Sequence, residues 1–114
     1  MKTELRIGNW VKIDSVGTQN QVTQILEKGV NCGSIGVLYE MIKPIPLTEE
    51  WLESVKGNDS FRLRFIKSIA AFEVERKYTS VYGEEWIFIS NCRYRHEWQN
   101  LHFALTGEEL TIKE

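Results

Sequence analysis

The residues best suited to nucleophilic or metal chemistry are two cysteines and two histidines: Cys32, Cys92, His96 and His102. Metal ligands on a helix share a face at spacings of three or four residues, so the wider spacing of His96 and His102 does not indicate a zinc site. Cys92 and His96 are close enough to suggest a thiol–imidazole pair, but no orienting group or oxyanion hole accompanies them. We expect buried free thiols, a surface His96, no metal and no catalytic residue.

Cations gather at the predicted start of the last helix. Arg93, Arg95 and His96 lie where free backbone N–H groups already give a positive potential. Together they predict a pocket for an anion or an acidic partner. The alternative is that Glu97, together with Glu84 or Glu85 from the hairpin predicted before this helix, neutralises them.

A second group of cations lies on two predicted strands. Arg62 and Arg64 alternate with apolar residues in one strand, and Arg76 follows in the next. A basic sheet face beside aromatic residues can follow a nucleic-acid backbone, so a nucleic-acid-binding accessory protein is the alternative function. Glu73 and Glu75 should, however, lie opposite the arginines, and cross-strand ion pairs are ordinary in sheets.

Composition sets the broad class. The chain has 114 residues, of which 42% are hydrophobic and 26% charged, values typical of one compact globular domain. The net charge of -2 provides no general attraction to nucleic acid or to an anionic membrane. No signal peptide, membrane span or nucleotide-binding glycine loop is present, so we expect a cytoplasmic protein without a cofactor.

The pattern of strands and helices predicts an α+β fold over a single domain, 1–114. Residues 1–43 should form an N-terminal curved β-sheet or small partial barrel, with a turn at 14–18, and 44–57 a connector with a short helix. Residues 58–114 should form an antiparallel β-meander with a C-terminal helix, about 95–105, packed on the sheet. The run 86–89 is apolar on both faces, which predicts a central strand covered on both sides.

Three blocks of sequence resemble a known family. They are residues 5–11 (LRIGNWV), 45–52 (IPLTEEWL) and 96–110 (HEWQNLHFALTGEEL). In these blocks the chain is similar to a family of small uncharacterised bacterial proteins, many of them prophage-associated. The resemblance implies a bacterial, mobile-element setting, and it carries over no cofactor and no catalytic residue.

The function that these observations predict is non-enzymatic binding of another protein, through an exposed aromatic residue or an open strand edge. Trp51 and Trp98 should anchor the core, whereas Trp10 lies near the N-terminal edge and is the candidate centre of an interaction patch. No residue pattern demands a homodimer, although pairing of strand edges makes one plausible. No membrane partner is expected.

Overall fold

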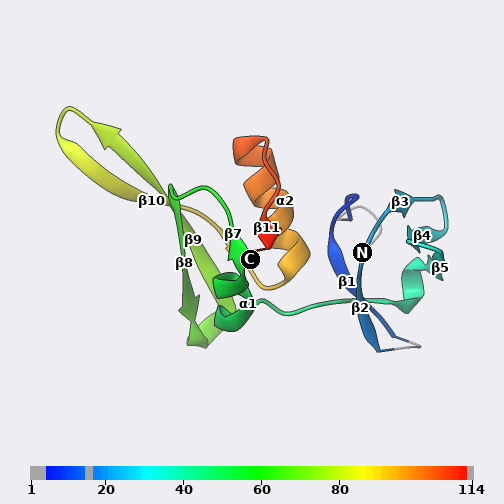
Figure 1. Ribbon diagram of the computed structural model, residues 1–114. Coiled ribbons are helices and arrows are strands. Elements are labelled where there is room, and N and C mark those ends of the chain that lie inside the picture. The colour runs from blue at the N-terminus through cyan, green and yellow to red at the C-terminus, as the bar shows by residue number, and fades with distance from the viewer. Residues whose placement is uncertain (1–4, 15–16, 113–114) are drawn as a thin grey trace. The chain divides into compact units, whose positions relative to one another are not determined.

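The chain forms antiparallel sheets and two α-helices, as the computed structural model of residues 5–14 and 17–112 shows (Figure 1). It divides into two compact units: one contains residues up to Pro46 with Tyr94–Leu101, and the other Leu47–Arg93 with the residues from His102 onward. The fold class is α+β, as predicted, and none of the sheets within the described ranges closes into a barrel. The single domain over 1–114 stays a prediction.

The first unit holds two small antiparallel sheets. One has the order β2–β1–β6, formed by Thr18–Gln21, Trp10–Ile13 and Ile42–Pro44. The other has the order β3–β4–β5, formed by Gln24–Ile25, Gly29–Cys32 and Ile35–Leu38, and the 3-10 turn η1 (Tyr39–Met41) leads from it into β6.

The first strand starts later than the apolar pattern from Leu5 suggests. Gly8 has a φ of 95°, a conformation that glycine adopts without a Cβ clash, so the chain turns before β1 begins at Trp10. Of the predicted turn at 14–18, Ser15 and Val16 lie outside the described residues. The main apolar cluster of this unit contains eight buried side chains: Leu5, Val11, Ile13, Val22, Val30, Cys32, Val37 and Ile42.

The second unit is built on the predicted meander. Its three strands are β8 (Phe61–Ile66), β9 (Ala71–Ser80) and β10 (Gly83–Cys92), in the order β10–β9–β8, with the 3-10 turn η2 (Lys67–Ile69) between the first two. A short pair, β7 (Val55–Lys56) with β11 (Thr111–Ile112), and helix α1 (Glu49–Ser54) complete it. Trp51, Phe72 and Val74 are buried, which gives this unit an apolar core of its own.

Helix α2 runs from Arg95 to Thr106 and contributes residues to both units. Its Trp98 is buried, as is Trp51 of α1, which confirms both as core residues. In the second unit the ring of His102 lies 5.8 Å from that of Phe61 on β8, so the end of the helix packs against the meander.

The expectation that residues 86–89 form a central, covered strand is wrong. They belong to β10, which is an edge strand, while β9 occupies the centre of the sheet. Ile87 is 44% exposed and Phe88 54% exposed. An apolar run normally indicates burial on both faces, but here the sheet ends at the strand that carries it.

Candidate functional site

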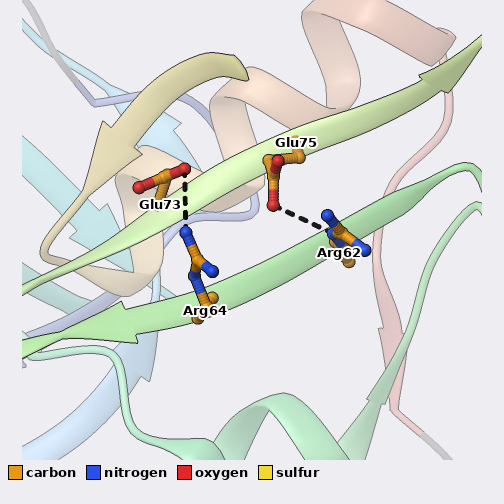
Figure 2. A network of polar contacts seen from close by, with 4 residues as sticks. All are labelled: Arg62, Arg64, Glu73 and Glu75. Atoms are coloured by element: carbon orange, nitrogen blue, oxygen red, sulfur yellow. Dashed lines mark hydrogen bonds and ion pairs between the residues drawn. The ribbon is translucent and has the colours of Figure 1, made fainter. Parts of the chain in front are cut away.

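The arginines of β8 are paired with carboxylates of β9. Arg62 Nε lies 2.9 Å from Glu75 Oε1, and Arg64 Nη2 lies 3.4 Å from Glu73 Oε1 (Figure 2). The strand register places each arginine directly opposite its partner, as expected from the sequence. The hydrogen bond from Arg62 lowers the pKa of Glu75, and this carboxylate therefore stays charged and offsets the cation.

Arg76 lies on the opposite face of the same sheet. It is registered with Phe61, whereas Arg62 is registered with Glu75, and adjacent positions along a strand point to opposite faces. Its guanidinium lies over the ring of Phe61 at 5.1 Å and near that of Tyr78 at 5.9 Å. The structure therefore does not bring Arg62, Arg64 and Arg76 together as one basic surface.

The three candidate anion ligands differ in exposure. Arg93 belongs to the second unit, is exposed, and accepts a hydrogen bond from the Leu47 N–H at its carbonyl, 2.8 Å. Arg95, in the first unit, is partly buried and donates to Gln19 Oε1 at 3.0 Å, and burial lowers its pKa. His96 is only 1% exposed, so the expectation of a surface histidine is wrong.

The chain supplies a carboxylate of its own at the start of α2. The N–H of Tyr94 donates to Glu97 Oε1 at 3.0 Å, the contact by which an acidic residue in the first turn caps a helix. His96 stacks on Tyr94, with ring centroids 6.0 Å apart and an interplanar angle of 9°. These contacts give Glu97 and His96 structural roles at the start of α2.

Trp10 is partly buried rather than exposed. Its backbone N–H donates to Gln99 Oε1 at 2.9 Å, and Gln99 Nε2 in turn donates to the carbonyl of Gly8 at 3.0 Å. The segment around Trp10 is thereby fixed to α2 within the first unit. This makes Trp10 a weaker candidate for the centre of an interaction patch than the sequence suggested.

A buried polar network, which sequence reasoning missed, surrounds that contact. Asn9 is fully buried; its Oδ1 accepts from the Arg6 N–H at 2.7 Å, and its Nδ2 donates to Asn100 Oδ1 at 2.8 Å. Arg6 Nε also donates to Asn100 Oδ1, at 3.1 Å. Because a buried amide must be hydrogen-bonded, this network fixes the helix on the N-terminal segment. The only signal was that the first and third blocks of the family resemblance contain these residues.

His102 is a satisfied core residue of the second unit. It is fully buried; Nε2 accepts from the Asn58 N–H at 2.9 Å and Nδ1 lies 2.9 Å from the Glu108 carbonyl. Only a neutral ring with its proton on Nδ1 makes both bonds, so His102 ties the segment after β7 to the chain beyond α2.

Neither cysteine is placed for nucleophilic chemistry. Cys32 and Cys92 are buried thiols, as expected, and burial raises the pKa of Cys32. Across residues 5–14 and 17–112, no group of three or more His, Cys, Asp and Glu side chains is arranged to hold a metal ion.

An open hollow of about 360 Å³ lies beside α1. Its lining residues are Leu47, Thr48, Glu49, Glu50, Phe65 and Phe72. The rings of Phe65 and Phe72 are 5.2 Å apart, and the Thr48 hydroxyl caps α1 by accepting from the Trp51 N–H at 3.1 Å. The hollow thus has an apolar floor and an acidic rim. The hydroxyl of Thr48 in its lining already accepts a hydrogen bond from the chain itself.

The most exposed apolar side chains lie on the β9–β10 hairpin. The register of β8 with β9 ends at Arg76, and one further backbone hydrogen bond runs from the Lys77 N–H to the Ser60 carbonyl at 2.7 Å, so beyond Lys77 β9 is paired only with β10. We call the projecting part, residues 77–86, the ribbon; Figure 1 shows it extending beyond β8. A two-stranded ribbon has little core of its own, and Tyr78 on it is 45% exposed.

The tip of the ribbon is the turn from Ser80 to Gly83. Ser80 Oγ accepts from the Tyr82 N–H at 3.1 Å, and Gly83 has a φ of 117°, which favours glycine. Between them, Val81 is 94% exposed and Tyr82 is 96% exposed. The tip therefore presents a β-branched and an aromatic side chain to solvent.

Behind the tip, β10 has aromatic residues on one face. Trp86 and Phe88 are registered with Lys77 and Glu75, which places them on the face that carries Arg62. The guanidinium of Arg62 lies over the Trp86 ring at 4.4 Å, which holds that side chain in place.

Comparison with known proteins gave no relatives: the chain matches no family model, no curated protein and no solved structure. Within the described part of the chain, neither helix has the length and apolar character needed to cross a membrane.

Proposed function

We propose that this is a non-enzymatic binding protein that engages another protein through the tip of the ribbon. The observation that supports this function is the exposure of Val81 and Tyr82, at 94% and 96%. Tight hairpin turns favour Asn, Asp and Gly, so the needs of the turn do not explain a valine and a tyrosine here. A tyrosine on a projecting hairpin can anchor in a pocket of a partner while losing little side-chain entropy.

The setting is part of the same proposal. The resemblance of residues 5–11, 45–52 and 96–110 to prophage-associated proteins supports a bacterial, mobile-element origin. A cytoplasmic location and a protein partner encoded by the host or by the same element are consistent with that origin.

The experiment that tests the proposal is affinity capture from the bacterial host with three baits: the wild type, a Val81→Ser/Tyr82→Ser double variant, and an Ile69→Ser variant. Ile69 is a matched control because it is 40% exposed and lies on η2, away from the ribbon. We expect the wild type and the control to retain a protein that the double variant loses. Retention of the same proteins by all three baits would overturn the proposal.

The arrangement of cations does not favour nucleic-acid binding as the main role. Arg62 and Arg64 each have a carboxylate partner, and Arg76 points to the other face. We expect the affinity for a labelled single-stranded oligonucleotide to be the same at about 50 mM and about 200 mM salt. Binding through phosphate contacts would instead weaken steeply over that range. Salt-sensitive binding that disappears in Arg62→Gln/Arg64→Gln would favour the nucleic-acid alternative.

A further inference from the structure

The outer edge of β10 is open over a regular segment. From Gly83 to Phe88 the strand keeps its register with β9, and the first irregularity comes between Phe88 and Ser90. The sheet order places no further strand beside β10 among the described residues. An edge of this length that bears exposed apolar side chains can pair with another strand, and it lacks the lysines and prolines that usually prevent such pairing.

We infer that this edge pairs antiparallel with the same edge of a second copy of the chain, about a twofold axis at Trp86. The inference rests on the proposed binding role of the ribbon but uses a different surface from its tip. In this register Trp86 lies opposite Trp86 of the second copy. Glu84 lies opposite Phe88 of the second copy, and Glu85 lies opposite Ile87.

In this register, the side chains that meet lie on the same face of both sheets. Residues directly opposite each other in an antiparallel pair share a face, and an axis on a residue pairs even-numbered positions with even-numbered ones. Glu84, Trp86 and Phe88 of both copies therefore meet on the face of Arg62. The tryptophans form a central aromatic pair, which is a favourable cross-strand contact.

The charge pattern favours a second copy in this orientation. The carboxylates of the segment, Glu84 and Glu85, are both at its start, and the apolar residues follow. An antiparallel pair separates the carboxylates of the two copies to opposite ends, where each faces an apolar residue. A parallel pair would place like charges side by side.

Arg76 supplies a complementary charge on the other face. It is registered with Ile87, and no ion pair seen in residues 5–14 and 17–112 includes either Arg76 or Glu85. In the proposed dimer, Glu85 of the second copy lies across Ile87 from Arg76, about 10 Å away by strand spacing. Side chains as long as arginine and glutamate can meet over that distance, and symmetry forms the contact twice.

Sedimentation equilibrium of the full chain tests the association. We expect a dimer for the wild type, a roughly 100-fold weaker dimer for Trp86→Lys, in which like charges meet at the axis, and no change for Ile69→Lys. A monomeric wild type at concentrations up to about 100 μM, where a specific dimer of micromolar Kd would be formed, would overturn the inference. A dimer that persists unchanged in Trp86→Lys would also overturn it.

Mixed cysteine variants test the register without altering Trp86. Glu84→Cys and Phe88→Cys are made as separate proteins, and mild oxidation follows with each alone and with the two mixed. Directly opposed residues have Cβ atoms close enough for a disulfide. We expect a covalent dimer in the mixture and little in either variant alone, and none when Ile69→Cys replaces one of them. Equal cross-linking in all samples would exclude this register.

The two proposals fail separately. The Val81→Ser/Tyr82→Ser variant should remain dimeric, because the tip lies outside the paired segment. A monomeric wild type that still captures a protein through Val81 and Tyr82 would overturn the second-copy inference alone. A dimer that captures nothing through its tip would overturn the proposed function alone.

Discussion

At the scale of single residues, Gly57 is the glycine of the second unit whose surroundings leave no room for a side chain. A Cβ atom at Gly57 would lie 2.6 Å from Leu110 Cδ2 and 2.9 Å from His102 Nε2. His102 cannot withdraw easily, because both ring nitrogens are held by backbone groups. The position beside His102 therefore requires a glycine, which has no Cβ.

The first prediction follows from this contact. Gly57→Ala should lower the free energy of unfolding by about 1–3 kcal/mol, the usual effect of overpacking a core. Gly36→Ala is the control, because a Cβ there meets only Asn31 Oδ1 at 3.4 Å, an ordinary contact. Urea unfolding followed by circular dichroism measures both. Equal stability of the two variants would contradict the role given to Gly57.

The second prediction concerns Glu75 and acid stability. The hydrogen bond from Arg62 lowers the pKa of Glu75 below 4.5, the value of an unperturbed glutamate. The ion pair therefore contributes its full stability above that value and loses it as the pH falls through the lowered pKa. Arg62→Gln should reduce the stability at neutral pH and flatten its decline below about pH 4.5.

Lys67→Gln is the matched control for this experiment. It removes one positive charge from the same unit, and Lys67 takes part in none of the ion pairs seen in the described residues. Unfolding curves recorded from pH 3 to pH 7 should separate the two variants. An acid profile of Arg62→Gln that matches the wild type would show that the pair has no net effect.

At the scale of elements, helix α2 depends on its capping carboxylate. The third prediction is that Glu97→Ala lowers the free energy of unfolding by about 1 kcal/mol, because the Tyr94 N–H loses its acceptor. Glu97→Gln keeps an oxygen at the same place and should retain most of the stability. Thermal unfolding of the two variants distinguishes them, and equal losses would mean that charge rather than the hydrogen bond matters.

The elements also show how far the sequence predicts the fold. Alternation in β8 predicted both the strand and its ion pairs, since Arg62 and Arg64 must lie on one face and the carboxylates of β9 opposite. The apolar run of β10 was assigned to the sheet centre because local pattern reports apolarity, not position in the sheet. Its place at the edge depends on which strands pair, and that information is not local.

The candidate site was harder to predict for the same reason. Asn9 is buried and donates a hydrogen bond to Asn100, which is 91 positions away in the chain. No spacing rule connects such residues. The tip of the ribbon was missed because Val81 and Tyr82 resemble strand residues, and only the turn between β9 and β10 exposes them.

At the scale of the whole molecule, neither unit is a continuous piece of chain. The first includes Tyr94 and the start of α2 as far as Leu101, and the second includes the residues from His102 onward. Gln99 and Asn100 complete the buried network around Asn9. Residues up to Pro46 therefore lack essential partners until the helix is present.

The fourth prediction tests this dependence with a shortened protein, residues 1–93. Without Trp98, Gln99 and Asn100, residues up to Pro46 should lose their dispersed amide signals in NMR spectra. Adding a peptide of residues 94–114 should restore those signals, at least in part. A shortened protein with native signals for β1 and β2 would show that this part folds without the helix.

The discontinuity of the first unit has a consequence for biosynthesis. A ribosome releases the strands of this unit early, yet the helix that secures them emerges only after the whole of β8, β9 and β10. The apolar side chains of the early strands therefore stay incompletely buried for most of the remaining translation. Nascent chains stalled before residue 94 should therefore be bound by chaperones and cut by proteases, and chains released after α2 should be protected.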